Sequence, residues 1–152
     1  MSGDSGDIYQ ARRLMNMRKN PDGRYANMSR SEIDSSIKRR STYLTTHQHT
    51  VVDGNGRQLK FYVGENDVEH LISDALGRAK GTLRLSDIST LHTHFQNATY
   101  EGSAKDTKGR KGVVFHYYKI TIDGREMYLN IMDDKLRHRK TLHSITSKMT
   151  KS

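Results

Sequence analysis

The sequence of 152 residues contains no cysteine and only one proline. The absence of cysteine excludes disulfide bonds and zinc sites that use thiolate ligands. No apolar run approaches the roughly 20 residues that span a bilayer, and residues 1–10 lack the basic and apolar regions of a signal peptide. We therefore expect a soluble protein that acts in the cytoplasm and has no membrane partner.

Apolar residues are also scarce, because they make up 33% of the chain, below the ordinary range. They fall in patterned runs, as in a folded protein with a small core. The proline, Pro21, lies in a turn cluster that ends a short basic helix over residues 8–19. The length is typical of one domain. We predict a flexible N-terminal tail with a short helix at residues 1–28 and a single domain at residues 29–152.

Positive charge, in contrast, is abundant and unevenly distributed. The net charge is +9, and residues 104–152 hold 12 Lys and Arg against 5 Asp and Glu, a net charge of +7. Such asymmetry favours a polyanionic partner, with nucleic acid ahead of a membrane surface. The alternative is a solvated basic surface that keeps the protein soluble.

Hydrophobic periodicity and capping signals predict helices ahead of this basic region. Ser29 and Glu32 have the spacing of a capping box, and Ser86 is expected to cap a helix that carries Asp87 in its first turn. Alternation on both sides of a turn at residues 53–56 predicts a hairpin. The expected helices are residues 29–44, 65–79 and 86–97, and the expected hairpin strands are residues 45–52 and 58–63.

The C-terminal stretch carries the strongest strand signals. Two alternating runs flank Asp123-Gly124, a dipeptide that favours a two-residue hairpin turn. We predict the α+β class, with N-terminal helices and the early hairpin at residues 29–97 packed on a small twisted antiparallel sheet at residues 98–147. The expected strands are residues 113–122, 125–132 and 141–146, with residues 98–101 as a further candidate and a basic loop at residues 133–140.

Alternation along these strands predicts which side chains share a face. His116 and Tyr118 project together from the first strand, where histidine can transfer protons and tyrosine can bind a phosphate or a base. On the last strand, Ser144 and Thr146 are expected on one face as phosphate ligands, and His143 and Ile145 on the other. Each of these residues has an ordinary alternative as a structural strand residue.

Two basic loops are expected to flank one cleft, if the strands are neighbours in order. Their Lys and Arg side chains can clamp phosphates and stabilise charge on a transferring phosphoryl group. The alternative is two flexible, solvated loops. The candidate phosphate-binding residues are Lys108, Arg110, Lys111, Arg137, Arg139 and Lys140.

Two His-x-His pairs, His47/His49 and His92/His94, raise a third alternative, a metal hydrolase. Two imidazoles at i and i+2 share a face on a strand and can hold zinc there, but not on a helix. No third ligand lies at a sequence spacing typical of a metal site, so we assign no metal. His94, at a helix end that leads into the sheet, is a candidate for proton transfer.

The order of the C-terminal motifs is informative. Leu-Ser-Asp-Ile begins a helix at residue 85, and Asn-Ala-Thr-Tyr, Phe-His-Tyr-Tyr, Tyr-Leu-Asn-Ile and Leu-His-Ser-Ile follow at residues 97, 115, 128 and 142. This order resembles the phage and polymorphic-toxin branch of the barnase–EndoU–colicin–RelE-like (BECR) nucleases over residues 84–147. The sequence departs from that pattern at residues 141–143, where an aromatic residue is expected before the serine.

The resemblance implies helices packed on a twisted antiparallel sheet, and a metal-independent ribonuclease without a cofactor. The RNA 2′-hydroxyl would attack, a base would take its proton, and an acid would protonate the leaving 5′-oxygen, giving a 2′,3′-cyclic phosphate. The implied partners are tRNA or rRNA and a cognate immunity or antitoxin protein. The positions that match the family's catalytic residues are His94, His116, Tyr118, Ser144 and Thr146.

A non-catalytic alternative remains open at this point. Some members of such families bind without cleaving, so the chain is alternatively a basic phage-type protein that recognises nucleic acid or a host protein.

Overall fold

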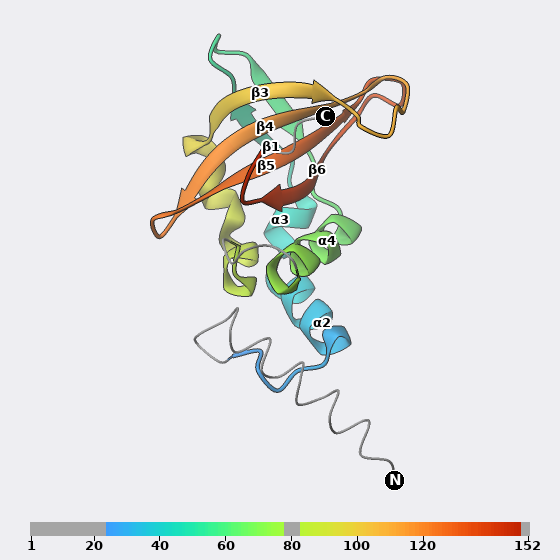
Figure 1. Ribbon diagram of the computed structural model, residues 1–152. Helices are drawn as coiled ribbons and strands as arrows, with labels where there is room; N and C mark the ends of the chain where they lie inside the picture. Colours follow the sequence, from blue (N-terminus) through green and yellow to red (C-terminus); the bar gives the residue numbers. More distant parts are fainter. Residues whose placement is uncertain (1–23, 78–82, 150–152) are drawn as a thin grey trace.

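The computed structural model describes residues 24–77 and 83–149, and it has the α+β architecture expected from the sequence. Helices and a two-stranded hairpin come first, and a four-stranded antiparallel sheet follows (Figure 1). The elements are α2 (Arg30–Arg40), α3 (Thr42–Thr46), β1 (His49–Val52), β2 (Gln58–Phe61), α4 (Glu65–Leu76), η1 (Leu85–Asn97), β3 (Thr99–Lys105), β4 (Val113–Ile122), β5 (Arg125–Asp134) and β6 (Arg139–Thr146).

Helix α2 begins at the predicted capping box. Ser29 Oγ accepts a hydrogen bond from the Glu32 amide (3.2 Å), and the Ser29 amide donates to Glu32 Oε1 (3.1 Å). The single helix predicted for residues 29–44 is interrupted, because α2 ends at Arg40 and the short α3 begins after it. Threonines crowd α3, and β-branched residues with hydroxyls that bond to nearby carbonyls weaken a continuous helix.

The segment η1 is a 3₁₀ helix in place of the expected α-helix, and its start is not capped by Ser86. The Arg84 amide donates instead to Asp87 Oδ2 (2.8 Å). The guanidinium of Arg125 on β5 donates to both oxygens of the same carboxylate (2.9 and 3.2 Å). The carboxylate of Asp87, which is buried, therefore links the start of η1 to the sheet.

The four strands form a meander in the order β3–β4–β5–β6. Asp123 and Gly124 make the predicted turn between β4 and β5, with φ values of 49° and 77°. A type I′ turn needs a positive φ at both positions, which Gly and Asp tolerate best. The ladder extends further than expected, so that the predicted basic loop of residues 133–140 shortens to residues 135–138.

A β-bulge shifts the register between β3 and β4. Tyr100 pairs with Tyr118, whereas Gly102 pairs with Tyr117, so that Glu101 is the extra residue. Gly102 has a φ of 138°, a conformation that glycine adopts far more readily than other residues. The bulge changes the alternation of side chains along β3.

A second bulge lies in β6. The register jumps by one residue opposite Asn130 and Ile131 of β5, so that His143 is the extra residue. As a result Leu142 and Ile145, which are three residues apart, both face the core, with exposed fractions of 0% and 1%. The expectation that His143 and Ile145 share a face is therefore wrong, because it assumed an unbroken alternation.

The helices lie on one side of the four-stranded sheet (Figure 1), which we call its covered face. We call the opposite side the open face. The core joins side chains of the helices, the β1–β2 hairpin and the covered face. Its fully buried members include Ile33, Leu44, Phe61, Leu71, Ile72, Ile88, Leu91, Leu129, Ile131 and Leu142.

The outer edge of β6 is bonded to segments from the first half of the chain. The Tyr62 amide donates to Lys140 O (2.9 Å), and the Leu142 amide donates to Tyr62 O (3.0 Å). Asp74 Oδ2 accepts a hydrogen bond from the Ile145 amide (3.0 Å). Unpaired edge groups recruit other strands, and these contacts satisfy them within the chain.

The core begins before the domain boundary predicted at residue 29, because Tyr25 is 1% exposed and belongs to the core. The rest of the predicted tail, residues 1–23, lies outside the described residues. Across the two described ranges, no helix is both long enough and apolar enough to cross a membrane.

Replacing Asp87 with Ala would remove a carboxylate that is 9% exposed from the guanidinium of Arg125, whose side chain is 17% exposed. Losing one partner of a buried ion pair costs about 3–5 kcal/mol. We expect the free energy of unfolding in urea to fall by about 3 kcal/mol. The control is Asp34→Ala, which removes the more exposed ion pair with Arg30 and should cost less than about 1 kcal/mol. Equal losses in the two variants would contradict the role of Asp87.

Candidate active site

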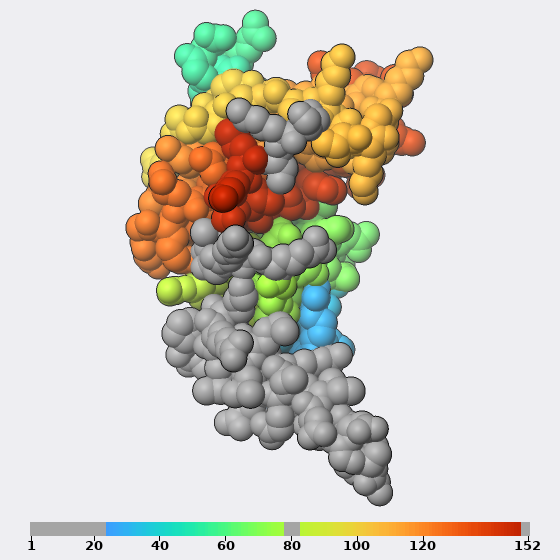
Figure 2. Space-filling view, viewed as in Figure 1, coloured from blue at the N-terminus to red at the C-terminus, as the bar shows by residue number. Residues whose placement is uncertain are grey.

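A pocket of about 200 Å³ opens on the open face beside β6. The face toward the viewer in Figure 2 shows β6 at the surface next to α4, with the β3–β4 loop above it. We call this cavity the open-face pocket. It is lined by Lys105, Asp106, Thr107, Lys108, Arg110, Phe115, Tyr117, Asn130, His143, Ser144 and Thr146.

A buried amide positions the two hydroxyls of this pocket. Asn130 is 3% exposed, and its Nδ2 donates to Ser144 Oγ (2.8 Å) and to Thr146 Oγ1 (3.3 Å). Thr146 Oγ1 donates in turn to Lys148 O (2.6 Å). Ser144 and Thr146 therefore share the open face, as strand alternation predicted.

His143 enters the pocket because the β6 bulge turns it away from the core. Its ring lies edge-on to Phe115, with ring centroids 5.3 Å apart, and 5.7 Å from the ring of His70 on α4. Burial lowers the pKa of His143 below its ordinary value, and the charges of His70 and Arg110 lower it further. The ring is consequently neutral at pH 7 and can accept a proton.

The β3–β4 loop supplies the cations of the pocket and is organised around Asp106. The Asp106 carboxylate accepts hydrogen bonds from the amides of Lys108 (3.3 Å) and Arg110 (3.1 Å) and from Arg110 Nε (2.6 Å). The Arg110 side chain is the main cause that lowers the pKa of Asp106 to about 2. In the part of the chain that the structure describes, Lys105 and Lys108 form no ion pair, so their ammonium groups are available to an anion.

The predicted phosphate-binding residues separate into two groups. Lys108 and Arg110 line the open-face pocket, whereas Lys111, Arg137, Arg139 and Lys140 are not among its lining residues. Arg137 is engaged by Asp134, with Nη1 2.9 Å from Oδ2. The expectation of one cleft flanked by both loops thus holds only for the β3–β4 loop.

His116 and Tyr118 share a face as predicted, but it is the covered face. His116 bonds to Ser103 and Asp133, away from the open-face pocket. Tyr118 is 2% exposed and belongs to the core, where burial raises the pKa of its hydroxyl to about 12. The residues predicted as one catalytic set therefore lie on opposite faces of the sheet.

The remaining histidine candidates lie outside the open-face pocket. His94 is half-buried near the end of η1. His49 is buried with Nε2 2.8 Å from Leu44 O, and His47 stacks on Tyr43 with ring centroids 3.8 Å apart. Within residues 24–77 and 83–149, no group of three His, Asp or Glu is placed to hold a metal ion.

Comparison of the chain with protein-family models, curated proteins and solved structures found no match.

Sequence reasoning missed His70, Asn130 and the open-face position of His143. A signal for the last existed, because Leu142 and Ile145 are both strongly apolar and three residues apart. Unbroken alternation buries only one of two such positions, so the pair itself indicates a bulge between them. His70 carried no local signal, since its proximity to β6 is a long-range contact.

The lowered pKa of His143 can be measured by NMR titration of its ring protons. We expect a midpoint below about 6.5, the ordinary histidine value, and an upward shift in His70→Gln, which removes a neighbouring charge. Lys60→Ala, at an exposed position of β2 that does not line the pocket, should leave the midpoint unchanged. A midpoint at or above the ordinary value would show that the ring is not buried as described.

The same pKa has a consequence for stability. Below about pH 6.5 the unfolded chain binds more protons at this position than the folded protein, so stability falls as the pH falls. His49, whose pKa is also lowered by burial, acts in the same direction. The pH dependence of urea unfolding should therefore become shallower in His143→Gln.

Proposed function

We propose that the protein is a metal-independent ribonuclease and that the open-face pocket is its active site. One observation carries the proposal: a histidine with a lowered pKa, His143, lies in the same pocket as Lys105, Lys108 and Arg110 and the Ser144 and Thr146 hydroxyls. A neutral imidazole beside fixed positive charge is what cleavage by the RNA 2′-hydroxyl needs.

The reaction proceeds by internal transfer of the phosphoryl group. His143 takes the proton of the 2′-hydroxyl, whose oxygen attacks the adjacent phosphorus. The bond to the 5′-oxygen breaks, and this oxygen receives a proton from a second acid. The products are a 2′,3′-cyclic phosphate and a 5′-hydroxyl, with no metal or cofactor consumed.

His70 is the group best placed to serve as that acid. It is exposed on α4, and its ring centroid is 5.7 Å from that of His143. A phosphate seated against the two rings would have the base on one side and the acid on the other, as in-line transfer requires. Lys108 and Arg110 would face the non-bridging oxygens and stabilise the charge that develops there.

The fold supports this proposal in a second way. The resemblance to the BECR nucleases implied helices packed on a twisted antiparallel sheet, and the chain has this arrangement. We propose that the protein acts as a toxin, an effector or a mobile-element protein on tRNA or rRNA in a cytoplasm. A cell that produces it would then need a cognate immunity protein.

The direct test is incubation of total tRNA and rRNA with the protein in EDTA, followed by analysis of the new ends. We expect 2′,3′-cyclic phosphate ends, and a loss of roughly 10²–10⁴-fold in rate for His143→Ala, the range for removing a general base. The matched control is His47→Ala, an exposed histidine outside the pocket, which should cleave at the wild-type rate. Absence of any cleavage in EDTA would overturn the proposal and leave the binding alternative.

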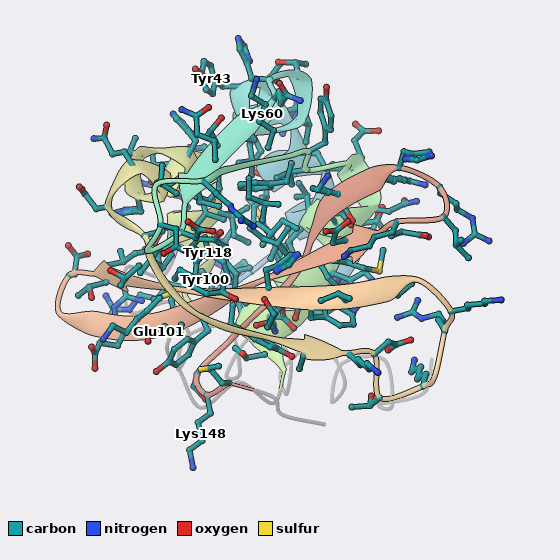
Figure 3. The ribbon with its side chains drawn as sticks, turned by 90° about the horizontal axis from the view of Figure 1, so that it is seen from above. Tyr43, Lys60, Tyr100, Glu101, Tyr118 and Lys148 are labelled. Atoms are coloured by element: carbon teal, nitrogen blue, oxygen red, sulfur yellow. The ribbon has the colours of Figure 1, made fainter. Side chains whose placement is uncertain are left out.

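The electrostatic part of the site can be tested by binding of single-stranded RNA at several salt concentrations. Each lost phosphate contact reduces the slope of log K against log salt by about 0.7 for a single strand. The double variant Lys105→Ala/Lys108→Ala should therefore reduce the slope by about 1.4. Lys60→Ala is the control, because Figure 3 places Lys60 on the side of the sheet opposite to Lys148, which follows the pocket strand β6. An unchanged slope in the double variant would show that these lysines do not contact phosphate.

A further inference from the structure

A second group of chemically active side chains lies on the covered face. Three neighbouring strands contribute Ser103, His116 and Asp133, joined in a chain of hydrogen bonds. Ser103 Oγ is 2.7 Å from His116 Nδ1, and His116 Nε2 is 3.0 Å from Asp133 Oδ2. A hydroxyl, an imidazole and a carboxylate in this order make up the arrangement that activates a nucleophilic serine.

The hydrogen-bonding capacities of these groups determine which group donates and which accepts in each hydrogen bond. A carboxylate only accepts hydrogen bonds, so His116 Nε2 carries the proton and donates it to Asp133. In the neutral imidazole, His116 Nδ1 is then the acceptor, and Ser103 Oγ donates to it. The serine proton is therefore already directed at the base that would remove it, and Asp133 holds the ring in this tautomer.

Solvent exposure of the three side chains increases from the Asp133 carboxylate, through the His116 ring, to the Ser103 hydroxyl. The Asp133 side chain is 10% exposed and that of His116 is 20% exposed, whereas Ser103 is exposed at the surface. The orienting group is thus protected from water, and the nucleophile is accessible.

The bulge in β3 adds a fourth group to the site. Because Glu101 is extra, Tyr100 and Ser103 project together, and the Tyr100 hydroxyl is 2.7 Å from Ser103 Oγ. Since Ser103 donates to His116, Tyr100 must donate to Ser103. The same donor is within reach of an oxyanion that forms on a group bonded to Ser103 Oγ.

The charges around Ser103, His116 and Asp133 favour acyl transfer over phosphoryl transfer. In the ranges that the structure describes, no Lys or Arg pairs with Asp133 or donates to Ser103 or His116. Phosphoryl transfer needs such cations to hold the phosphate. Acyl transfer needs a base and a neutral donor, and both are present.

We propose that Ser103, His116 and Asp133 form a second catalytic site, which hydrolyses small uncharged carboxylic esters. Ser103 Oγ attacks the carbonyl carbon as its proton passes to His116 Nδ1. The bond to the alcohol oxygen breaks, and this oxygen leaves with that proton. Water then attacks the acyl-serine, gives a proton to His116 Nδ1 and releases the acid, and Ser103 regains its proton from His116.

The test is covalent labelling of the full-length protein with phenylmethylsulfonyl fluoride, together with hydrolysis of p-nitrophenyl acetate. We expect one adduct per chain, located on Ser103 by peptide mass spectrometry. His116→Ala and Asp133→Asn should each slow both labelling and hydrolysis by roughly 10²-fold or more. Ser35→Ala, which removes an exposed serine on α2, should change neither rate.

Far-ultraviolet circular dichroism of each variant separates loss of the site from loss of the fold, and Ser103→Ala provides a small substitution at an exposed position. Failure to label Ser103 in the folded wild-type protein would overturn the proposal, as would equal labelling in folded His116→Ala. Neither result bears on RNA cleavage, because that reaction is assigned to the opposite face of the sheet.

Discussion

Two single-residue bulges determine what the four-stranded sheet can do. In an unbroken strand, residues three apart point to opposite faces. The extra residue His143 lets Leu142 and Ile145 both enter the core, and the displaced imidazole comes to lie at the rim of the open face. The extra residue Glu101 brings Tyr100 and Ser103 together on the other face. Each bulge therefore places one polar group beside partners that strict alternation would have kept apart.

The covered and open faces also place two imidazoles in opposite electrostatic settings. Burial disfavours the charged form of His143, and the charges of His70 and Arg110 disfavour it further. His116 is bonded to the carboxylate of Asp133, which orients the ring and can stabilise an imidazolium during a reaction. One ring is suited to take a proton beside a phosphate, and the other to relay a proton from a serine hydroxyl. The strands of the sheet lie between the two proposed sites and so separate them.

Much of the fold was predictable because its signals are local. The capping box at Ser29, the turn at Asp123-Gly124 and the alternation in β4 depend on residues that are close in sequence, and all three are confirmed. The α+β class is confirmed for the same reason. The predicted cap at Ser86 failed because the adjacent Asp87 has an additional partner in Arg125, 38 residues away. Tertiary contacts of this kind override capping preferences that are close in energy.

The candidate site was less predictable. Alternation along a strand shows which side chains share a face, but it does not show which face the helices will cover. Alternation correctly grouped His116 with Tyr118 and Ser144 with Thr146, yet the two pairs lie on opposite sides. A bulge inserts one extra residue and shifts the alternation by one position. Side chains beyond the bulge then point to the face opposite to the one that unbroken alternation predicts. This is why His143 was expected on the wrong side.

The position of the pocket also bears on the first half of the chain. The resemblance to nucleases covers only residues 84–147, which left the role of residues 1–80 open. Yet α4 places the ring of His70 5.7 Å from that of His143, and Asp74 and Tyr62 bond to the backbone of β6 on either side of His143. An edge strand without such partners frays or pairs elsewhere. The helices and the hairpin therefore hold the bulged strand in place, and the proposed active site belongs to the whole domain rather than to its C-terminal sheet.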